Sequence, residues 1–333
     1  MNVMVARSRR ARILCAASVL LALVTGLTAG TASAANGRAG KSVRIAYLSF
    51  AVANSYDAPM LAAAKAAAKT GGGTITVLDA NNDPKKQFAQ LQTASTSGQF
   101  DAIIVQPIFG TGLITLVKQV IAKNIKVVAL DQILGPNLTT NKAQVPGLSG
   151  SVVQVPSDIG VKLGQLVVKA CAANHLDPCN VGYLYDIKAS ALDIAIRKGY
   201  LGSVKGHSEI KQVAEGQTFF TPAKGLAAAQ TMLQSNPDLN LIVGSDQGIE
   251  GAVRAVGKKV ALVGYGGSAA AKAGILSGRW YGSVWQVPAT EGRLATQCAI
   301  KAVNTGKVCP VPNLPLQIVT KANAKRFTGE WPG

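Results

Sequence analysis

Short apolar stretches alternate with longer segments of helical character along most of this 333-residue chain. The apolar stretches run for four to six positions and are rich in β-branched residues, which is typical of strands buried on both faces. We expect strands at residues 43–48, 74–78, 102–105, 126–130, 181–185, 209–214, 239–244, 260–263 and 281–285. The segments between them predict helices at residues 61–69, 84–97, 112–123, 158–173, 191–203, 222–235, 249–256 and 269–276.

Several predicted helices carry their own start signals. Asp83-Pro84 supplies an N-cap followed by proline at the first helical position, and Thr221-Pro222 repeats that arrangement. In the helix after Pro84 we expect Phe88 and Leu91 to form the inward face. The boundaries of these helices therefore follow from local chemistry.

Apolar strands separated by helices predict parallel sheets covered on both faces. About ten such units exceed one open sheet, so we expect an α/β fold with two doubly wound parallel-sheet lobes. The breaks at Val155-Pro156 and Gln286-Val287-Pro288, with a third after Pro312, predict crossings between the lobes. The expected lobes are residues 42–153 plus 288–311, and residues 156–285 with the tail 313–333.

The first 34 residues have the composition of a secretory signal. They contain four arginines at positions 7, 9, 10 and 12, an apolar run at 13–27, and the small-residue cleavage pattern Ala32-Ser33-Ala34. We therefore expect residues 1–34 to be removed and the protein to be exported, to the periplasm or the cell exterior. Arg9-Arg10 leaves a twin-arginine signal open as an alternative to the general route. No later apolar stretch reaches the ~20 residues that a membrane-spanning helix needs.

Removal of residues 1–34 leaves four of the five cysteines, and export changes how these four are interpreted. An even number of cysteines in an oxidising compartment favours disulfides. Four cysteines allow three pairings, and the short separations favour Cys171–Cys179 and Cys298–Cys309, each tying the end of a helix to the following loop. A metal site is the weaker alternative, because the chain has no CxxC pair and only two histidines. We expect neither metal nor cofactor.

The formal net charge of +18 comes from 34 Lys and Arg against 16 Asp and Glu. Nucleic-acid binding is one meaning of such a charge. The basic residues are scattered singly, without a basic helix or a stripe interleaved with aromatic residues. The charge therefore indicates a solvated basic surface rather than a nucleic-acid partner.

Polar side chains follow the predicted strands in both halves of the chain. They are Asn54, Tyr56, Asp57, Asp131, Gln132, Asp186, Ser245, Asp246 and Gln286. Each has a purely structural alternative, since Asp57 and Asp246 could cap helices and Asp131 could begin a turn. Their recurrence at corresponding places favours a polar cleft between the lobes, because ligands of such folds bind at the carboxyl ends of the strands.

Four segments resemble one known family when they are taken in order. Val43-Arg44-Ile45-Ala46-Tyr47 with Asn54-Ser55-Tyr56-Asp57 resembles the first strand and ligand loop of the type I periplasmic binding proteins, the ribose- and galactose-binding group. Residues 125–131 resemble the strand of that family that ends in a sugar-binding Asp. Gly264-Tyr265-Gly266-Gly267 and Gln286-Val287-Pro288 resemble its "G-[FY]-D-G" turn and its last hinge crossing.

The resemblance implies a solute-binding protein of an ABC importer that captures a sugar-like ligand by hinge closure. It also implies a membrane permease as partner and a monomeric protein. Carried over by position, the ligand contacts are Asn54, Tyr56, Asp57, Asp131, Gln132, Phe220, Ser245, Asp246 and Gln286. Phe220 has a second interpretation, in which Phe219-Phe220 is simply buried core.

Three positions depart from the family pattern. Gln132 stands where the sugar binders have Arg, Ile194 stands at the place of another Arg, and Gly266 replaces the Asp of the turn. We therefore expect a roomier, less charged pocket. A modified sugar, a polyol or a more apolar small molecule becomes a plausible ligand beside a plain pentose or hexose.

Other functions are weighed on the same residues. An enzyme is disfavoured because the chain has no Gly-x-Ser-x-Gly elbow, no phosphate-binding loop and no HExxH. A sugar-responsive repressor needs an N-terminal helix-turn-helix, where this chain has an export signal. A receptor that presents a non-sugar solute to a membrane sensor is not separable from an importer component by sequence.

Overall fold

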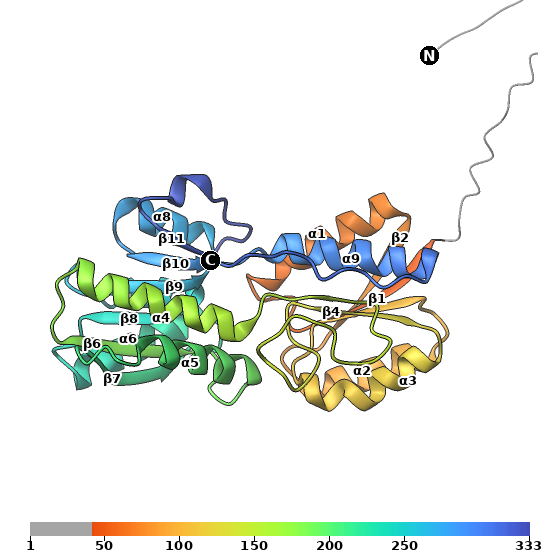
Figure 1. Ribbon diagram of the computed structural model, residues 1–333, viewed down its shortest axis with the longest axis horizontal. Coiled ribbons are helices and arrows are strands. Elements are labelled where there is room, and N and C mark those ends of the chain that lie inside the picture. The colour runs from red at the N-terminus through yellow and green to blue at the C-terminus, as the bar shows by residue number, and fades with distance from the viewer. Residues whose placement is uncertain (1–41) are drawn as a thin grey trace, which may run out of the picture. The chain divides into compact units, whose positions relative to one another are not determined.

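The structure, a computed structural model, describes residues 42–333 and contains two β-sheets flanked by helices (Figure 1). The strand orders are β2-β1-β3-β4-β5 and β11-β10-β9-β8-β6-β7. Within the described residues every strand pair is parallel except β10 with β11. This is the expected α/β fold with two parallel-dominated sheets.

The first sheet is covered on both faces. Its strands are β1 (Val43–Ser49), β2 (Gly73–Asp79), β3 (Ala102–Val105), β4 (Lys126–Leu130) and β5 (Gly150–Val152). Its helices are α1 (Asp57–Gly71), α2 (Pro84–Thr96), η1 (Gly110–Leu113), α3 (Ile114–Ala122) and α9 (Pro288–Thr305). Ile45 and Tyr47 of β1 pack toward α1 and α9, whereas Ala46 and Leu48 pack toward α2 and α3. Burial on both faces explains why the strand is apolar at successive positions.

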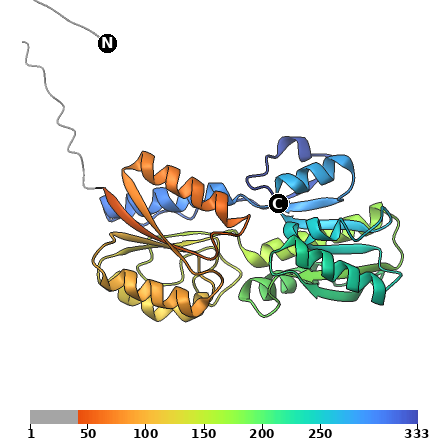
Figure 2. The ribbon, with the colours of Figure 1, turned by 180° about the vertical axis from the view of Figure 1, so that it is seen from behind.

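Helix α9 follows β10 of the second sheet and then packs on the first sheet. Both views show it beside α1, although the two helices lie far apart in sequence (Figure 2). A Cβ added at Gly292 of α9 would stand 2.1 Å from the Met60 carbonyl oxygen of α1. The close approach of the two helices therefore requires glycine at this position.

The second sheet has the same layered construction. Its strands are β6 (Cys179–Tyr185), β7 (Ile210–Gln217), β8 (Leu241–Ser245), β9 (Ala261–Gly266), β10 (Gly282–Trp285) and β11 (Gln317–Thr320). Its helices are α4 (Pro156–Ala173), α5 (Ala191–Val204), α6 (Pro222–Ser235), α7 (Asp246–Ala252), α8 (Ala269–Ser277) and η2 (Ala324–Arg326). One core cluster joins α4 and α5 to the sheet, and another joins α6, α7 and α8 to it.

Two strands lie where the apolar pattern predicts none. β5 has only three residues, which is too short for a recognisable pattern, and it extends the first sheet by pairing with β4. β11 pairs antiparallel with β10 and closes one edge of the second sheet. Both strands depend on a long-range neighbour rather than on local periodicity.

The inward face of α2 is only partly the expected one. Leu91 is fully buried, but Phe88 is 41% exposed, so that part of the prediction is wrong. The buried face consists of Gln87, Leu91, Ala94 and Ser95, which recur at spacings of three and four residues around Leu91. Gln87 tolerates burial because its amide donates to the carbonyl of Gln106 at 2.8 Å and accepts from the backbone of Ile108 at 2.9 Å.

The two disulfides join the expected cysteines. Cys171 near the end of α4 is bonded to Cys179, and Cys298 is bonded to Cys309, with a Cα–Cα distance of 5.8 Å in each pair. The secondary structure at these cysteines differs from the expectation in two respects. Cys179 opens strand β6 rather than lying in a loop, and Cys298 lies inside α9 rather than at its end.

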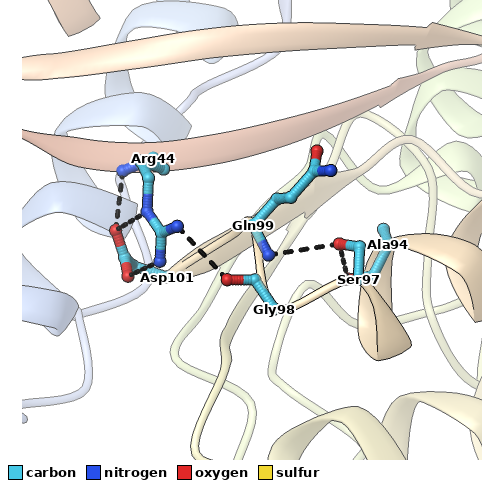
Figure 3. Close-up of polar contacts among 6 residues, drawn as sticks. All are labelled: Arg44, Ala94, Ser97, Gly98, Gln99 and Asp101. Carbon is cyan, nitrogen blue, oxygen red and sulfur yellow. Dashed lines mark hydrogen bonds and ion pairs between the residues drawn. The ribbon is translucent and has the colours of Figure 1, made fainter.

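An ion pair joins Arg44, near the start of β1, to Asp101, just before β3 (Figure 3). It lies at the end of the first sheet where these strands begin, away from their carboxyl ends. The Arg44 guanidinium donates to Asp101 from Nη2 at 2.8 Å and from Nε at 3.1 Å, and its backbone N–H also donates to Asp101. Arg44 Nη1 donates further to the Gly98 carbonyl at 3.2 Å. These contacts hold the turn before β3 against β1.

The predicted signal sequence at residues 1–34 lies outside the described residues. From residue 42 to residue 333, no helix combines the length and the apolar character needed to cross a membrane.

Candidate functional site

A cavity lies at the carboxyl ends of strands from both sheets. On the side of the first sheet, Gln106 follows β3 and Asp131 follows β4; on the side of the second, Ser245 ends β8 and Gln286 follows β10. Ligands of parallel α/β sheets bind at this edge. The cavity is lined by Phe50, Asn54, Tyr56, Asp57, Gln106, Asp131, Gln132, Gln154, Ile159, Leu192, Phe220, Ser245, Gln247, Tyr265, Gly266, Gln286 and Trp331.

The structure brings together most of the side chains expected to bind ligand. Those that line the cavity are Asn54, Tyr56, Asp57, Asp131, Gln132, Phe220, Ser245 and Gln286. Asp246 is the exception, because it is buried beside the cavity and is not part of its wall.

Asp246 is bonded to the protein instead. Its carboxylate accepts from the Ser268 backbone N–H at 2.8 Å and from the Ser283 hydroxyl at 2.8 Å. It does not cap α7, since Ser245 is the N-cap and accepts from the Gly248 N–H at 3.3 Å. Burial raises the pKa of Asp246 to about 6, and its hydrogen bonds offset part of this effect.

Gln106 links the two acidic side chains of the cavity wall. Its Nε2 donates to Asp57 Oδ1 at 2.6 Å and to Asp131 Oδ2 at 3.0 Å. Gln132 Nε2 also donates to Asp131 Oδ2 at 3.0 Å. Asp57 is the first residue of α1 but not its N-cap, which is Tyr56, and its carboxylate accepts from the Gln106 amide and from the Ala51 backbone. Two acids far apart in sequence are thereby held at one place.

A third acid, Glu291 of α9, lies behind the cavity wall. The Tyr56 hydroxyl stands 3.4 Å from Asp131 Oδ1 and 3.5 Å from Glu291 Oε2. Glu291 Oε1 accepts from the Gln154 backbone N–H at 3.1 Å. Sequence reasoning missed Glu291, because it lies inside a helix rather than at a strand end.

Burial is the main influence on all three acids. It raises the pKa of Asp57 and of Glu291 well above the usual carboxyl range, and it raises that of Asp131. The charge of Asp131 raises the pKa of Asp57 and Glu291 further. Among the described residues, no group of three or more His, Cys, Asp or Glu side chains is arranged to hold a metal ion.

On the side of the second sheet, the buried Asp186 organises the wall without lining the cavity. Its carboxylate accepts from the hydroxyls of Thr218, Ser245 and Tyr265, and the Ser245 contact is 2.7 Å long. Burial first, and then the charge of Asp193, raises the pKa of Asp186 to about 7. Asp186 therefore fixes the orientation of Ser245 and Tyr265.

The turn after β7 directs one phenylalanine into the cavity and the other outward. Phe219 and Phe220 both have positive φ, at 50° and 55°, and the Phe220 N–H donates to the Thr218 hydroxyl at 3.2 Å. The strained backbone places Phe220 in the cavity wall, edge-to-face with Phe50 at 6.2 Å, and leaves Phe219 50% exposed. The pair is therefore not buried core.

Trp331, near the end of the chain, closes another part of the wall. Its indole Nε1 donates to the Gly266 carbonyl at 2.8 Å, and its ring packs edge-to-face on Tyr56 at 5.4 Å. Gly266 has φ of 135°, and a Cβ there would stand 2.6 Å from the indole. The space expected from the missing Asp of the turn is therefore occupied by Trp331.

Some lining residues could have been found from the sequence and others could not. Gln106 directly follows a predicted strand, and Tyr265 stands in the turn motif, so the strand-end rule reaches both. Gln154, Leu192 and Trp331 carry no such signal, because long-range packing alone brings them to the cavity.

The chain is similar to known sugar-binding proteins over most of its length. The ribose import binding protein of Bacillus subtilis is 24% identical over 258 residues, which cover 76% of this chain and 79% of that protein. The D-allose-binding periplasmic protein of Escherichia coli is 25% identical over 256 residues, covering 74% of this chain and 80% of that protein.

Solved structures show the same fold. An ABC transporter solute binding protein from Mycobacterium smegmatis with bound glycerol has a TM-score of 0.76 at 24% identity, covering 88% of this chain and 99% of that chain. The Caulobacter myo-inositol binding protein bound to myo-inositol has a TM-score of 0.72 at 21% identity, covering 86% and 96%. The family model of the periplasmic binding protein domain matches residues 45–307. This chain therefore belongs to the periplasmic binding protein domain family.

Proposed function

We propose that this protein is exported and captures a small sugar-like or polyol solute in the cavity for an ABC permease in the membrane. The observation that carries the proposal is the cavity wall, in which amide, carboxyl and hydroxyl groups from the ends of both sheets surround one space. Such groups donate to and accept from vicinal hydroxyls, and the rings of Tyr56, Phe220 and Trp331 can pack on the apolar face of a sugar. The ligands named for relatives, ribose, D-allose and myo-inositol, fit this chemistry.

The same proposal includes hinge closure between two lobes, of residues 42–153 plus 288–311 and of residues 156–285 plus 313–333. Support comes from the crossing segments, where the Gln154 side chain accepts from the Val287 N–H at 3.3 Å and donates to the Leu314 carbonyl at 3.4 Å. A ligand that contacts both lobes only in the closed form provides the free-energy difference that closure requires.

A thermal-shift screen of sugars and polyols, followed by titration calorimetry, tests the proposal. A ligand at 100 times its dissociation constant stabilises the folded state by roughly 2.7 kcal/mol. Asp131→Ala removes an acceptor of charge-assisted hydrogen bonds, whose loss costs about 1.5–3 kcal/mol. We expect affinity to fall by one to two orders of magnitude with the fold intact.

Asp83→Ala is the matched control. Asp83 caps α2 by accepting from the N–H groups of Lys85 and Lys86, and it does not line the cavity. Its removal should cost about 1 kcal/mol of stability and leave affinity unchanged. If Asp131→Ala binds the cognate solute as tightly as the parent does, the site proposed at the end of β4 is wrong.

A further inference from the structure

A second cavity adjoins the one described above, which we call the solute cavity. Four residues line both of them: Phe50, Gln132, Leu192 and Phe220. Phe50 follows β1 of the first sheet, whereas Leu192 lies in α5 and Phe220 follows β7 on the side of the second sheet, so the shared wall is built from both sides. The second cavity is therefore a continuation of the solute cavity and not a separate hollow on the outer surface.

The wall of the second cavity is almost entirely apolar. The apolar residues that line only this cavity include Ile108, Ile133, Leu138, Pro156, Ile187 and Ala191. Among the described residues, no Lys, Arg, His, Asp or Glu is part of this wall, and its polar side chains are those of Gln132 and Ser190. The solute cavity, in contrast, is lined by Asp57, Asp131 and several amide side chains. One continuous space thus has a polar part and an apolar part.

The polar side chains of the apolar part are already bonded within the protein. Gln132 Nε2 donates to Asp131 Oδ2 at 3.0 Å, which directs this amide toward the solute cavity. The Ser190 hydroxyl accepts from the Asp193 N–H at 3.1 Å as the N-cap of α5, and the Ile187 N–H donates to the Asp193 carboxylate at 2.6 Å. A buried water needs about two to four polar partners, and the side chains of this wall offer few. An apolar group is therefore the favourable occupant.

A strained turn holds an aromatic ring where the two cavities meet. Phe219 and Phe220 have φ of 50° and 55°, and this conformation leaves the Phe219 ring 50% exposed. Backbone strain and an exposed apolar ring both oppose folding, and such strain is typical of a position that binds a ligand. Phe220 packs edge-to-face on Phe50 at 6.2 Å, and both rings line both cavities. The turn thus keeps an aromatic contact surface at the junction.

We propose that the solute is a sugar or polyol that carries an apolar substituent, such as the aglycone of a glycoside, and that this substituent binds in the second cavity. This inference rests on the proposed function, which by itself requires only a hydroxylated solute in the solute cavity. The substituent passes Phe50 and Phe220 and is buried against the apolar wall. Binding is favoured in proportion to the apolar area that leaves water, and aromatic contacts with the two rings add to it.

Matched glycosides test the inference. For D-glucose, D-galactose and D-ribose, titration calorimetry compares the free sugar with its methyl and phenyl glycosides, as both anomers. We expect at least one phenyl glycoside to bind about tenfold or more tightly than its methyl counterpart, because burying two methylene-sized groups is worth about that factor. Its binding should also have a more negative heat-capacity change, which is the signature of buried apolar surface.

Ala191→Leu narrows the second cavity from a position that does not line the solute cavity. Residue 191 is the first residue of α5, where Ser190 remains the N-cap, so leucine is compatible with the helix. This variant should reduce the preference for the phenyl over the methyl glycoside about tenfold, since about two methylene-sized groups lose their place. Ala189→Leu is the matched control, because Ala189 is exposed and lines neither cavity, and it should keep the preference. Thermal unfolding verifies that both variants are folded.

The outcomes separate the two proposals. If free sugars or methyl glycosides bind and no phenyl glycoside binds more tightly, the inference of an apolar substituent is overturned and the proposed function stands. If a phenyl glycoside is preferred but folded Ala191→Leu keeps that preference, the substituent does not bind in the second cavity. If no sugar, polyol or glycoside binds, both proposals fail.

Discussion

The buried Asp246 should make the protein less stable as the pH rises. Burial raises its pKa to about 6 in the folded protein, against 3.8 for an ordinary Asp. A group with a raised pKa binds its proton more tightly in the folded state than in the unfolded state. Its contribution is therefore fully present below pH 3.8 and is lost as the pH rises through about 6.

Asp246→Asn removes this dependence and keeps the local hydrogen bonds. The asparagine oxygen can accept from the Ser268 N–H, and its amide can donate to the Ser283 hydroxyl, which also has the Val284 carbonyl within 3.5 Å. The difference between a pKa of 3.8 and one of about 6 corresponds to a loss of about 3 kcal/mol in the free energy of unfolding from strongly acidic to alkaline pH. Between pH 5 and pH 8, the titration of Asp246 lowers the free energy of unfolding by about 1.4 kcal/mol.

We would measure this contribution by urea unfolding of the parent and of Asp246→Asn at pH 5 and pH 8. The other buried acids act in both proteins, so the difference between the two proteins isolates residue 246. We expect the loss of stability from pH 5 to pH 8 to be about 1.4 kcal/mol smaller in the variant. An equal loss in both proteins would refute the reasoning.

Ligand affinity measured on the same variant decides the role of Asp246. The structure bonds this carboxylate to Ser268 and Ser283, so we expect affinity to stay within about twofold of the parent. A tenfold loss of affinity with normal folding would favour the direct ligand contact that the family resemblance implies.

Two further predictions concern the fold. Gly292→Ala should lower the free energy of unfolding, measured by urea titration, by at least about 2 kcal/mol, because its Cβ would stand 2.1 Å from the Met60 carbonyl oxygen. Gly202→Ala is the control: a Cβ there would have nothing within 4 Å, so this change should stabilise α5 by about 0.5–1 kcal/mol. Replacing both Cys298 and Cys309 with serine should cost about 2–3 kcal/mol, because the disulfide closes a loop of 11 residues in the unfolded chain; no change in the urea midpoint would contradict this.

The sequence by itself determined the layers of the fold and eight of the seventeen residues that line the cavity. Strands such as β1 are apolar at successive positions because both of their faces are buried, and that property is local and readable. Asp83-Pro84 begins α2 through its own capping chemistry. Parallel strands end at a common edge, so the positions of Asp131 and Gln286 followed from strand boundaries alone.

Only the tertiary structure decided which of these groups line the cavity and what completes its wall. Asp246 and Asp131 both stand at strand ends. The carboxylate of Asp246 is hydrogen-bonded to Ser268 and Ser283 and does not line the cavity, whereas the side chain of Asp131 does. Trp331 reaches the cavity from the tail, and Glu291 reaches its back from inside α9. The physical reason is that local periodicity specifies the elements, whereas the direction of a polar side chain depends on partners supplied by distant segments.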